Sequence, residues 1–160
     1  METVLEDLRG KASELGMVLS GWDASGEVLP EPAVGNEFCR LVCSSNDPCA
    51  KARYALASCV LRKGESSRTT SPLGCCMLGI PVRNRRRLIG AMVLEYPTRE
   101  MLDDEHLARV CDRLQLDRQV MTTYAQQACR HSAAEAPDLP SVRRGPTNAL
   151  HRGLAGKAAR

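Results

Sequence analysis

The chain has 160 residues, of which 43% are apolar and 26% are charged, and this balance is typical of a globular domain rather than of a disordered or membrane-embedded chain. At this length roughly 70% of the unfolded chain's surface can be buried, so a full hydrophobic core is attainable without disulfides or structural metals. The aromatic residues are one tryptophan, three tyrosines and one phenylalanine, too few for a nucleic-acid binder that stacks bases on several aromatic side chains.

The net charge of +3 is divided unevenly along the chain. Residues 137–160 carry five bases and one acid, which leaves 17 bases and 18 acids on the other 136 residues. Prolines and glycines also concentrate in this stretch, so we expect residues 1–131 to form one domain and residues 132–160 to be a basic linker or disordered tail. The N-terminus carries acids where a secretory signal carries bases, and no apolar run approaches the roughly 18 residues that span a bilayer. These features predict a cytoplasmic protein without membrane contact.

The first half of the chain predicts helices around one hairpin. Apolar residues at helical spacing predict an amphipathic helix over residues 2–15, ending near Gly16. Two short apolar runs, 17–22 and 27–29, flank turn-forming residues 23–26 and predict a hairpin. Asn36 is a suitable cap for a short helix that continues to Cys43. Asn46 or Asp47 before a proline marks the start of a longer helix through residue 63, which Gly64 ends.

The second half predicts the clearest strand pair. After a polar loop over residues 65–74, the runs 76–82 and 88–96 flank a polar turn at 83–87. Both runs are apolar almost throughout, which favours central strands covered on two faces, and Pro81 indicates a strand edge or a bulge. A stripe of apolar residues then predicts one long helix over residues 103–131. The expected fold class is α+β, an antiparallel sheet flanked by helices with a long C-terminal helix.

Eight cysteines are unusual for a cytoplasmic domain, and five of them fall into two clusters. Cys39 and Cys43 are four residues apart, so their thiols project from one face of the short helix. Cys49 lies in the first turn of the next helix, where unpaired amides and the helix dipole favour a thiolate. Cys75 and Cys76 are adjacent at a loop-to-strand junction, and if they point to opposite sides only one of them can join a common site.

Grouped thiolates are the ligands that zinc and iron–sulfur clusters require. The five clustered cysteines, Cys39, Cys43, Cys49, Cys75 and Cys76, are therefore candidate metal ligands, although the paired C-x-x-C spacing is missing. The alternative is that these cysteines are small buried hydrophobic residues, and this is the interpretation we favour for Cys59, Cys111 and Cys129. The sequence holds no Gly-rich phosphate loop and no catalytic motif of the G-x-S-x-G or H-E-x-x-H type. The three histidines are isolated, and we expect no enzyme activity.

With these elements placed, residues 15–101 resemble the bacterial sensory domains of the PocR type, which are related in architecture to PAS and GAF domains. The likeness is carried by the D-x-x-G turn at Asp23, the pair Phe38-Cys39 with Cys49 following, a cysteine before the strand that contains Pro81, and the Leu-Ile-Gly strand at residues 88–90. Such domains commonly have a Cys-His pair where this chain has Cys75-Cys76, and a Gly-Gln where it has Glu95-Tyr96. A second thiol in place of the imidazole makes any metal site softer.

The resemblance implies a PAS/GAF-like signal-input domain that binds a small molecule or a redox centre and regulates an attached or partner output module. It implies ligand contacts from Trp22, Phe38, Cys39, Cys49 and Cys75, and a homodimer formed through terminal helices. The competing hypothesis is a structural dimerisation module with inert, buried cysteines. A third, nucleic-acid binding through the arginine-rich turn and the basic tail, is disfavoured by the nearly neutral body of the chain.

Overall fold

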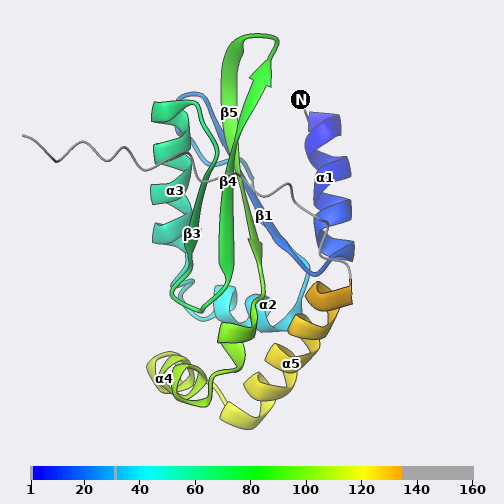
Figure 1. The fold of residues 1–160 in the computed structure, drawn as a ribbon, viewed down its shortest axis with the longest axis vertical. Coiled ribbons are helices and arrows are strands. Elements are labelled where there is room, and N and C mark those ends of the chain that lie inside the picture. Colours follow the sequence, from blue (N-terminus) through cyan, green and yellow to red (C-terminus); the bar gives the residue numbers. More distant parts are fainter. Residues whose placement is uncertain (1, 31, 135–160) are drawn as a thin grey trace, which may run out of the picture.

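The computed structural model describes residues 2–30 and 32–134. Its centre is an antiparallel sheet with the strand order β2-β1-β5-β4-β3 (Figure 1). The strands are β1 (Val18–Asp23), β2 (Ala33–Val34), β3 (Ser67–Thr70), β4 (Cys76–Asn84) and β5 (Arg87–Tyr96). Together with the helices around it, this sheet confirms the predicted α+β class. The predicted tail, residues 132–160, lies almost entirely outside the described residues.

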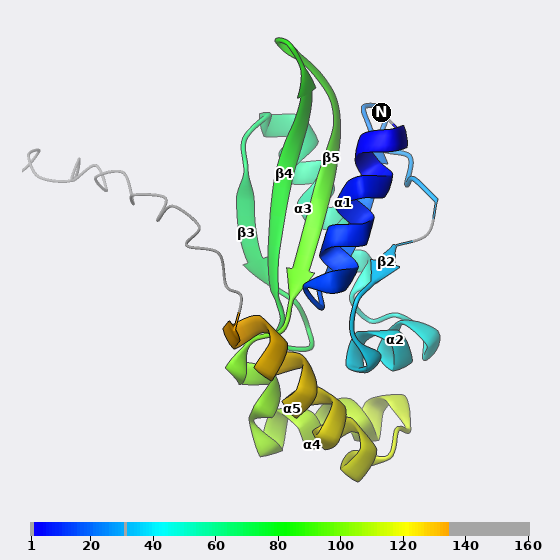
Figure 2. The same ribbon diagram turned by 90° about the vertical axis from the view of Figure 1, so that its right-hand side faces the viewer.

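Helices cover the sheet unevenly. The helices are α1 (Glu2–Glu14), α2 (Glu37–Ser44), α3 (Ala50–Lys63), α4 (Asp104–Leu114) and α5 (Arg118–Ala134), with a short 3-10 helix η1 (Arg99–Leu102) before α4. Helix α3 packs on one face of the sheet, α1 lies over part of the other, and α2, α4 and α5 gather at one end (Figures 1 and 2). In the part of the chain that is described, no helix combines the length and apolarity needed to cross a membrane.

Local signals in the sequence account for several helix boundaries. The Asn36 side chain accepts a hydrogen bond from the Cys39 amide at 2.8 Å, so it caps α2 as predicted. Gly64 adopts a left-handed conformation, with φ at 69°, and ends α3. Helix α1 ends two residues before Gly16, where the sequence predicted its end.

The core consists of two clusters. One lies between α3 and the sheet face that packs on it, hereafter the inner face; it contains Trp22, Leu56, Val60, Met77 and Val93 among others. The other fills the end of the sheet where α2, η1, α4 and α5 meet, and it contains Phe38, Cys39, Cys49, Cys75 and Met101 among others. Three of the clustered cysteines therefore belong to one core region.

Three expected elements differ from the structure. The predicted long helix is two helices, because Gln115 takes a left-handed conformation that ends α4 and Asp117 caps the start of α5; the apolar stripe continues on both sides of this break and hides it. The predicted polar loop contains β3, a polar edge strand that pairs with residues 76–79 of β4. Among the described residues, the predicted hairpin return at residues 27–29 makes one isolated bridge, between Trp22 and Val28, and the strands that pair with β1 are β2 and β5.

Pro81 lies where the prediction allowed it. The pairing of β3 with β4 ends at Gly79, so β4 has no neighbour on that side at Pro81. The β4–β5 register shifts immediately afterwards, between Val82 and Arg83. A residue without an amide hydrogen is tolerated at such a position because no ladder hydrogen bond is lost.

Candidate functional site

A buried ion pair joins helix α3 to strand β5. The Arg53 side chain, on the first turns of α3, donates a hydrogen bond from Nη1 to Oε2 of Glu95 at 3.0 Å. Arg53 is 4% exposed and Glu95 only 1% exposed. Arg53 also donates from Nη2 to the half-buried Asp47, just before α3. Charges this deeply buried are rare in proteins and require partners of opposite charge.

A group of four thiols lies beside this ion pair. Cys39 and Cys43 come from α2, Cys49 is the residue at the N-terminal cap of α3, and Cys75 directly precedes β4. Glu95 influences the pKa of Cys49, and Cys39 influences the pKa of Cys75. Cys75 also lies 3.3 Å from the Met101 sulfur. We call this group, Cys39, Cys43, Cys49 and Cys75 with Arg53 and Glu95, the thiol site.

The surroundings of the thiol site favour protonated thiols. Burial, followed by the negative charge of Glu95, raises the pKa of Cys49. The interaction with Cys39, together with burial, raises the pKa of Cys75 well above its ordinary value. Burial and the charge of Asp47 raise the pKa of Cys43 to about 12. The prediction that the start of α3 favours a thiolate at Cys49 is therefore wrong, because desolvation and the Glu95 carboxylate outweigh the helix dipole.

The residues as placed do not form a ready metal centre. Among the described residues, no group of three or more His, Cys, Asp or Glu side chains is placed so that it could hold a metal ion. Protonated thiols must also lose their protons before they can bind zinc or iron. The predicted zinc or iron–sulfur centre stays a prediction, and its donors do not fit the ion in the arrangement seen.

Cys76 lies apart from the other clustered cysteines, as the alternation of side chains along a strand requires. It is half-buried on the sheet face opposite α3, where it pairs with Tyr96 across β4 and β5. The Arg68 Nε donates to its sulfur at 3.0 Å, and the same guanidinium donates to the Tyr96 hydroxyl. This small polar group occupies the end of that face nearest the helices α4 and α5.

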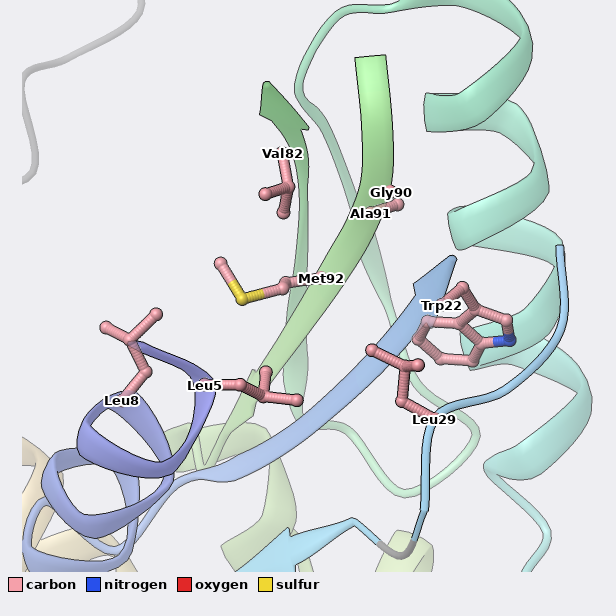
Figure 3. A pocket seen from close by; sticks show the side chains of 8 residues that line it. All are labelled: Leu5, Leu8, Trp22, Leu29, Val82, Gly90, Ala91 and Met92. Carbon is pink, nitrogen blue, oxygen red and sulfur yellow. The ribbon is translucent and has the colours of Figure 1, made fainter. Parts of the chain in front are cut away.

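The predicted ligand contacts divide between two regions. Phe38 is packed in the same core cluster as Cys39, Cys49 and Cys75. Trp22 lies in the other cluster and lines a small cavity of about 60 Å³ between α1 and the sheet, together with Leu5 and Met92 (Figure 3). The structure therefore brings four of the five residues together and places Trp22 elsewhere.

The remaining cysteines are in ordinary packing positions. Cys111 is buried in the core at the helical end of the molecule. Cys129 is half-buried and its thiol donates to the Thr98 carbonyl at 3.1 Å. Cys59 is half-buried on α3. Burial raises the pKa of Cys111 and of Cys129. Both thiols are therefore protonated at neutral pH and pack as small apolar side chains.

Sequence reasoning missed the charges of the thiol site. Glu95 is the only charged residue in the apolar run from Leu88 to Tyr96, and a lone carboxylate in a buried strand is the signal that could have revealed it. Each of the two acids that pair with Arg53 has one buried oxygen without a hydrogen-bond partner among the described residues: Oε1 of Glu95 and Oδ1 of Asp47. Buried polar atoms of this kind are uncommon and call for an explanation.

No protein-family model matches the chain, and no curated protein matches it. A search of solved structures finds the GAF domain/HD domain protein from Geobacter sulfurreducens, at 20% sequence identity and a TM-score of 0.40 over 78% of this chain and 93% of that chain. A TM-score of this size is too low to carry the function of that protein over to this chain. The α+β assignment rests on the strand order, and the PocR-type resemblance stays a prediction.

Proposed function

We propose that this chain is a non-catalytic signal-input domain whose thiol site responds to a small molecule, a soft metal ion or a redox centre and regulates an attached or partner output module. One observation supports this proposal above all: a group of four thiols lies beside a buried ion pair, Arg53 with Glu95, in which one carboxylate oxygen has no hydrogen-bond partner among the described residues. Core packing requires neither thiols nor charges at such a place. These thiols and charges are capable of binding and redox chemistry that the packing of the core does not require.

The location of the thiol site suits a sensor. Its residues come from α2, the start of α3, the segment before β4 and the end of β5, and α2 packs directly on α5. A cation bound in place of thiol protons changes the net charge beside Glu95 by its own charge less the number of protons released, and so alters the electrostatic balance around Arg53. A shift of the side chains at the thiol site then displaces β5, which carries Glu95, and α5, which packs on α2.

Metal binding and thiol chemistry test the proposal on the full chain, purified with reductant and without oxygen. We expect cadmium to produce thiolate charge-transfer absorption, more strongly as the pH rises because the ion must displace thiol protons. Zinc, iron and sulfide analysis and visible spectra show whether the purified protein already carries a metal or a cluster. Cys49→Ser should reduce the response, whereas the matched variant Cys129→Ser, outside the thiol site, should leave it unchanged.

Absence of bound metal, of sulfide and of any Cys49-dependent response to cadmium or to a thiol oxidant would overturn the role of the thiols in sensing. The alternative function, a structural dimerisation module with inert cysteines, is favoured by one observation: the pKa values of Cys43, Cys49 and Cys75 are raised, Cys43 to about 12. That alternative requires all the buried cysteines to react with a labelling reagent equally slowly in the folded protein, with no site-specific difference.

A further inference from the structure

The turn between β4 and β5 is strongly basic. Residues 83–87 read Arg-Asn-Arg-Arg-Arg, and all five side chains are exposed. Exposed Arg62 and Lys63 lie in the last turn of α3, and the Arg83 side chain donates a hydrogen bond to the carbonyl of the next residue, Gly64, at 2.8 Å. The turn and the end of α3 are therefore adjacent. We call the six cations Arg62, Lys63, Arg83, Arg85, Arg86 and Arg87 the basic tip.

The basic tip divides the charge of the domain. Residues 1–136 carry 17 bases and 18 acids, so they are almost neutral as a whole. The segments 62–65 and 83–87 hold six of these bases and one of the acids, which leaves 11 bases and 17 acids on the rest. The near neutrality that disfavoured nucleic-acid binding in the sequence is thus an average over a basic tip and an acidic remainder. A polyanion is attracted to the tip alone.

Local structure accounts for only part of the basic tip. The two cations at the end of α3 complement the negative end of the helix dipole, and Arg83 bonds to the residue that ends this helix. Arg85, Arg86 and Arg87 have no comparable role. Within the described ranges their side chains form no ion pair and no hydrogen bond. Three charges at the turn are therefore available to a partner.

Arg85 occupies a backbone position that suits a different residue. It is the first of the two turn residues between β4 and β5, and its φ is 55°. This left-handed conformation in a tight hairpin turn favours glycine or asparagine. An arginine there adds a charge and makes the turn less stable than those residues would. Backbone conformation does not explain the choice, which leaves the chemistry of the side chain as the reason.

The basic tip stands at the end of a two-stranded ribbon. The pairing of β4 with β3 ends at Gly79, and the pairing of β5 with β1 ends at Gly90. Beyond these residues β4 and β5 pair only with each other among the described strands. The ribbon therefore projects past the helices and the other strands (Figures 1 and 2). The major groove of B-form DNA, about 12 Å wide, admits a two-stranded ribbon of this kind.

We propose that the basic tip binds duplex DNA, with the β4–β5 ribbon entering the major groove. A guanidinium donates paired hydrogen bonds to phosphate oxygens, and a groove presents phosphates on both sides of an inserted ribbon. The acidic remainder of the domain is repelled by the phosphates, which confines the contact to the tip. This activity goes beyond the proposed sensing function and does not depend on the thiol site.

The composition of the tip disfavours other acidic partners. Protein interfaces have an apolar centre, and residues 83–87 include no apolar side chain. Single-stranded nucleic acids are bound by stacking on aromatic rings, and these residues include none. The major groove of duplex RNA is too narrow for side chains to read. A flat anionic membrane would meet only the end of the ribbon, whereas a groove contacts both of its sides.

Fluorescence anisotropy of a labelled DNA duplex of mixed sequence, titrated with the full chain, tests the proposal. We expect a dissociation constant of about 1 to 100 µM near physiological salt, which is usual for contacts to phosphates alone. Contact with about three phosphates gives a slope of about −3 when the logarithm of the association constant is plotted against that of the salt concentration.

Charge removal locates the contact. Arg86→Gln together with Arg87→Gln should weaken binding about tenfold and reduce the steepness of the salt dependence by about two. The matched pair Arg113→Gln with Arg130→Gln removes equal charge from exposed positions of α4 and α5, which belong to the helices at the other end of the sheet (Figure 2). That pair should leave binding unchanged. Residues 137–160, which are also basic, are present in every variant.

Arg85→Asn separates binding from stability, because its two readouts should diverge. Asparagine tolerates a positive φ, so the midpoint of thermal unfolding, followed by circular dichroism, should stay the same or rise. Affinity for the duplex should fall severalfold, and the steepness of the salt dependence by about one, since one phosphate contact is lost. An unchanged affinity would contradict the role given to this side chain.

The proposal is wrong if the full chain does not bind duplex DNA at low salt. It is also wrong if the tip variants weaken binding no more than the Arg113 and Arg130 pair does, because the contact then lies elsewhere in the chain. Equal or tighter binding to single-stranded DNA, duplex RNA, polyglutamate or phosphatidylserine vesicles, measured under the same conditions, would assign the tip to another class of partner and overturn the proposal.

Discussion

Replacing Arg53 by methionine tests how much the buried ion pair between Arg53 and Glu95 contributes to the free energy of unfolding. The substitution keeps the length and apolar stem of the side chain but removes the guanidinium that bonds Glu95 at 3.0 Å. Glu95 is 1% exposed, so its carboxylate cannot gain water in exchange. One oxygen of that carboxylate already lacks a partner among the described residues.

The expected loss is large. Removing one partner of a buried ion pair costs about 3 to 5 kcal/mol, because a buried charge is left uncompensated. Single domains are stable by about 5 to 15 kcal/mol, so Arg53→Met should remove a large share of the total. Replacing both partners, as Arg53→Met with Glu95→Leu, should cost less than the single change, because no charge is then stranded. Asp47 stays partly solvated in both variants.

Urea unfolding followed by circular dichroism measures these differences. Arg40→Ala is the matched control, because Arg40 forms an exposed ion pair with Glu37 at 3.7 Å and such pairs contribute at most about 1 kcal/mol. If Arg53→Met costs no more than Arg40→Ala, or if the double variant is the less stable one, the account of Arg53 and Glu95 as a tightly coupled buried pair is wrong.

Three further predictions concern single features. Asn36→Ala should cost about 1 kcal/mol by urea unfolding, because the cap hydrogen bond to α2 is lost; an unchanged midpoint would contradict that role. Gly79→Ala should destabilise the fold by about 1 to 3 kcal/mol in the same assay, since a Cβ there would lie 2.7 Å from Cγ2 of Val60; a neutral effect would mean that α3 moves away without cost. The free energy of unfolding should fall as pH rises above about 9. Burial raises the pKa of Cys43 from 9.0 to about 12 in the folded chain. Between pH 9 and pH 12 the unfolded chain therefore holds fewer protons than the folded chain. The slope is at most about 1.4 kcal/mol per pH unit for each thiol, and less for the partly exposed Cys43; a Cys43→Ala variant with an unchanged pH profile above 9 would contradict this.

Much of the fold could be predicted because its signals are local. The cap at Asn36, the left-handed glycine at Gly64 and the apolar runs of β4 and β5 each act within a few residues. The predictions failed where a local pattern has two structural solutions. The stripe from Leu107 to Met121 is compatible with one helix or with two helices joined at Gln115, and only the packing of α4 against α5 selects the second.

The candidate site shows the same division. Residue types alone identified Cys39, Cys49 and Cys75 as chemically interesting, and alternation along the strand separated Cys76 from Cys75. Nothing local indicated that the Cys49 pKa would be raised, because the responsible charge, Glu95, is distant in the sequence and meets it only through the sheet. The partner of that charge, Arg53, occupies a helix position that resembles any solvated arginine.

The sequence by itself determined most of the helices and the central strand pair, the α+β class and the thiol-rich composition, since spacing, capping and residue chemistry act over short stretches of chain. The tertiary structure alone decided which groups share an environment: Arg53 with Glu95, the group of thiols beside them, and the side chains of β4 and β5 that meet Leu5 and Leu8 of α1 across the small cavity. Strand order and register set these neighbours, and both depend on contacts between residues far apart in the chain, whose energies no local pattern contains.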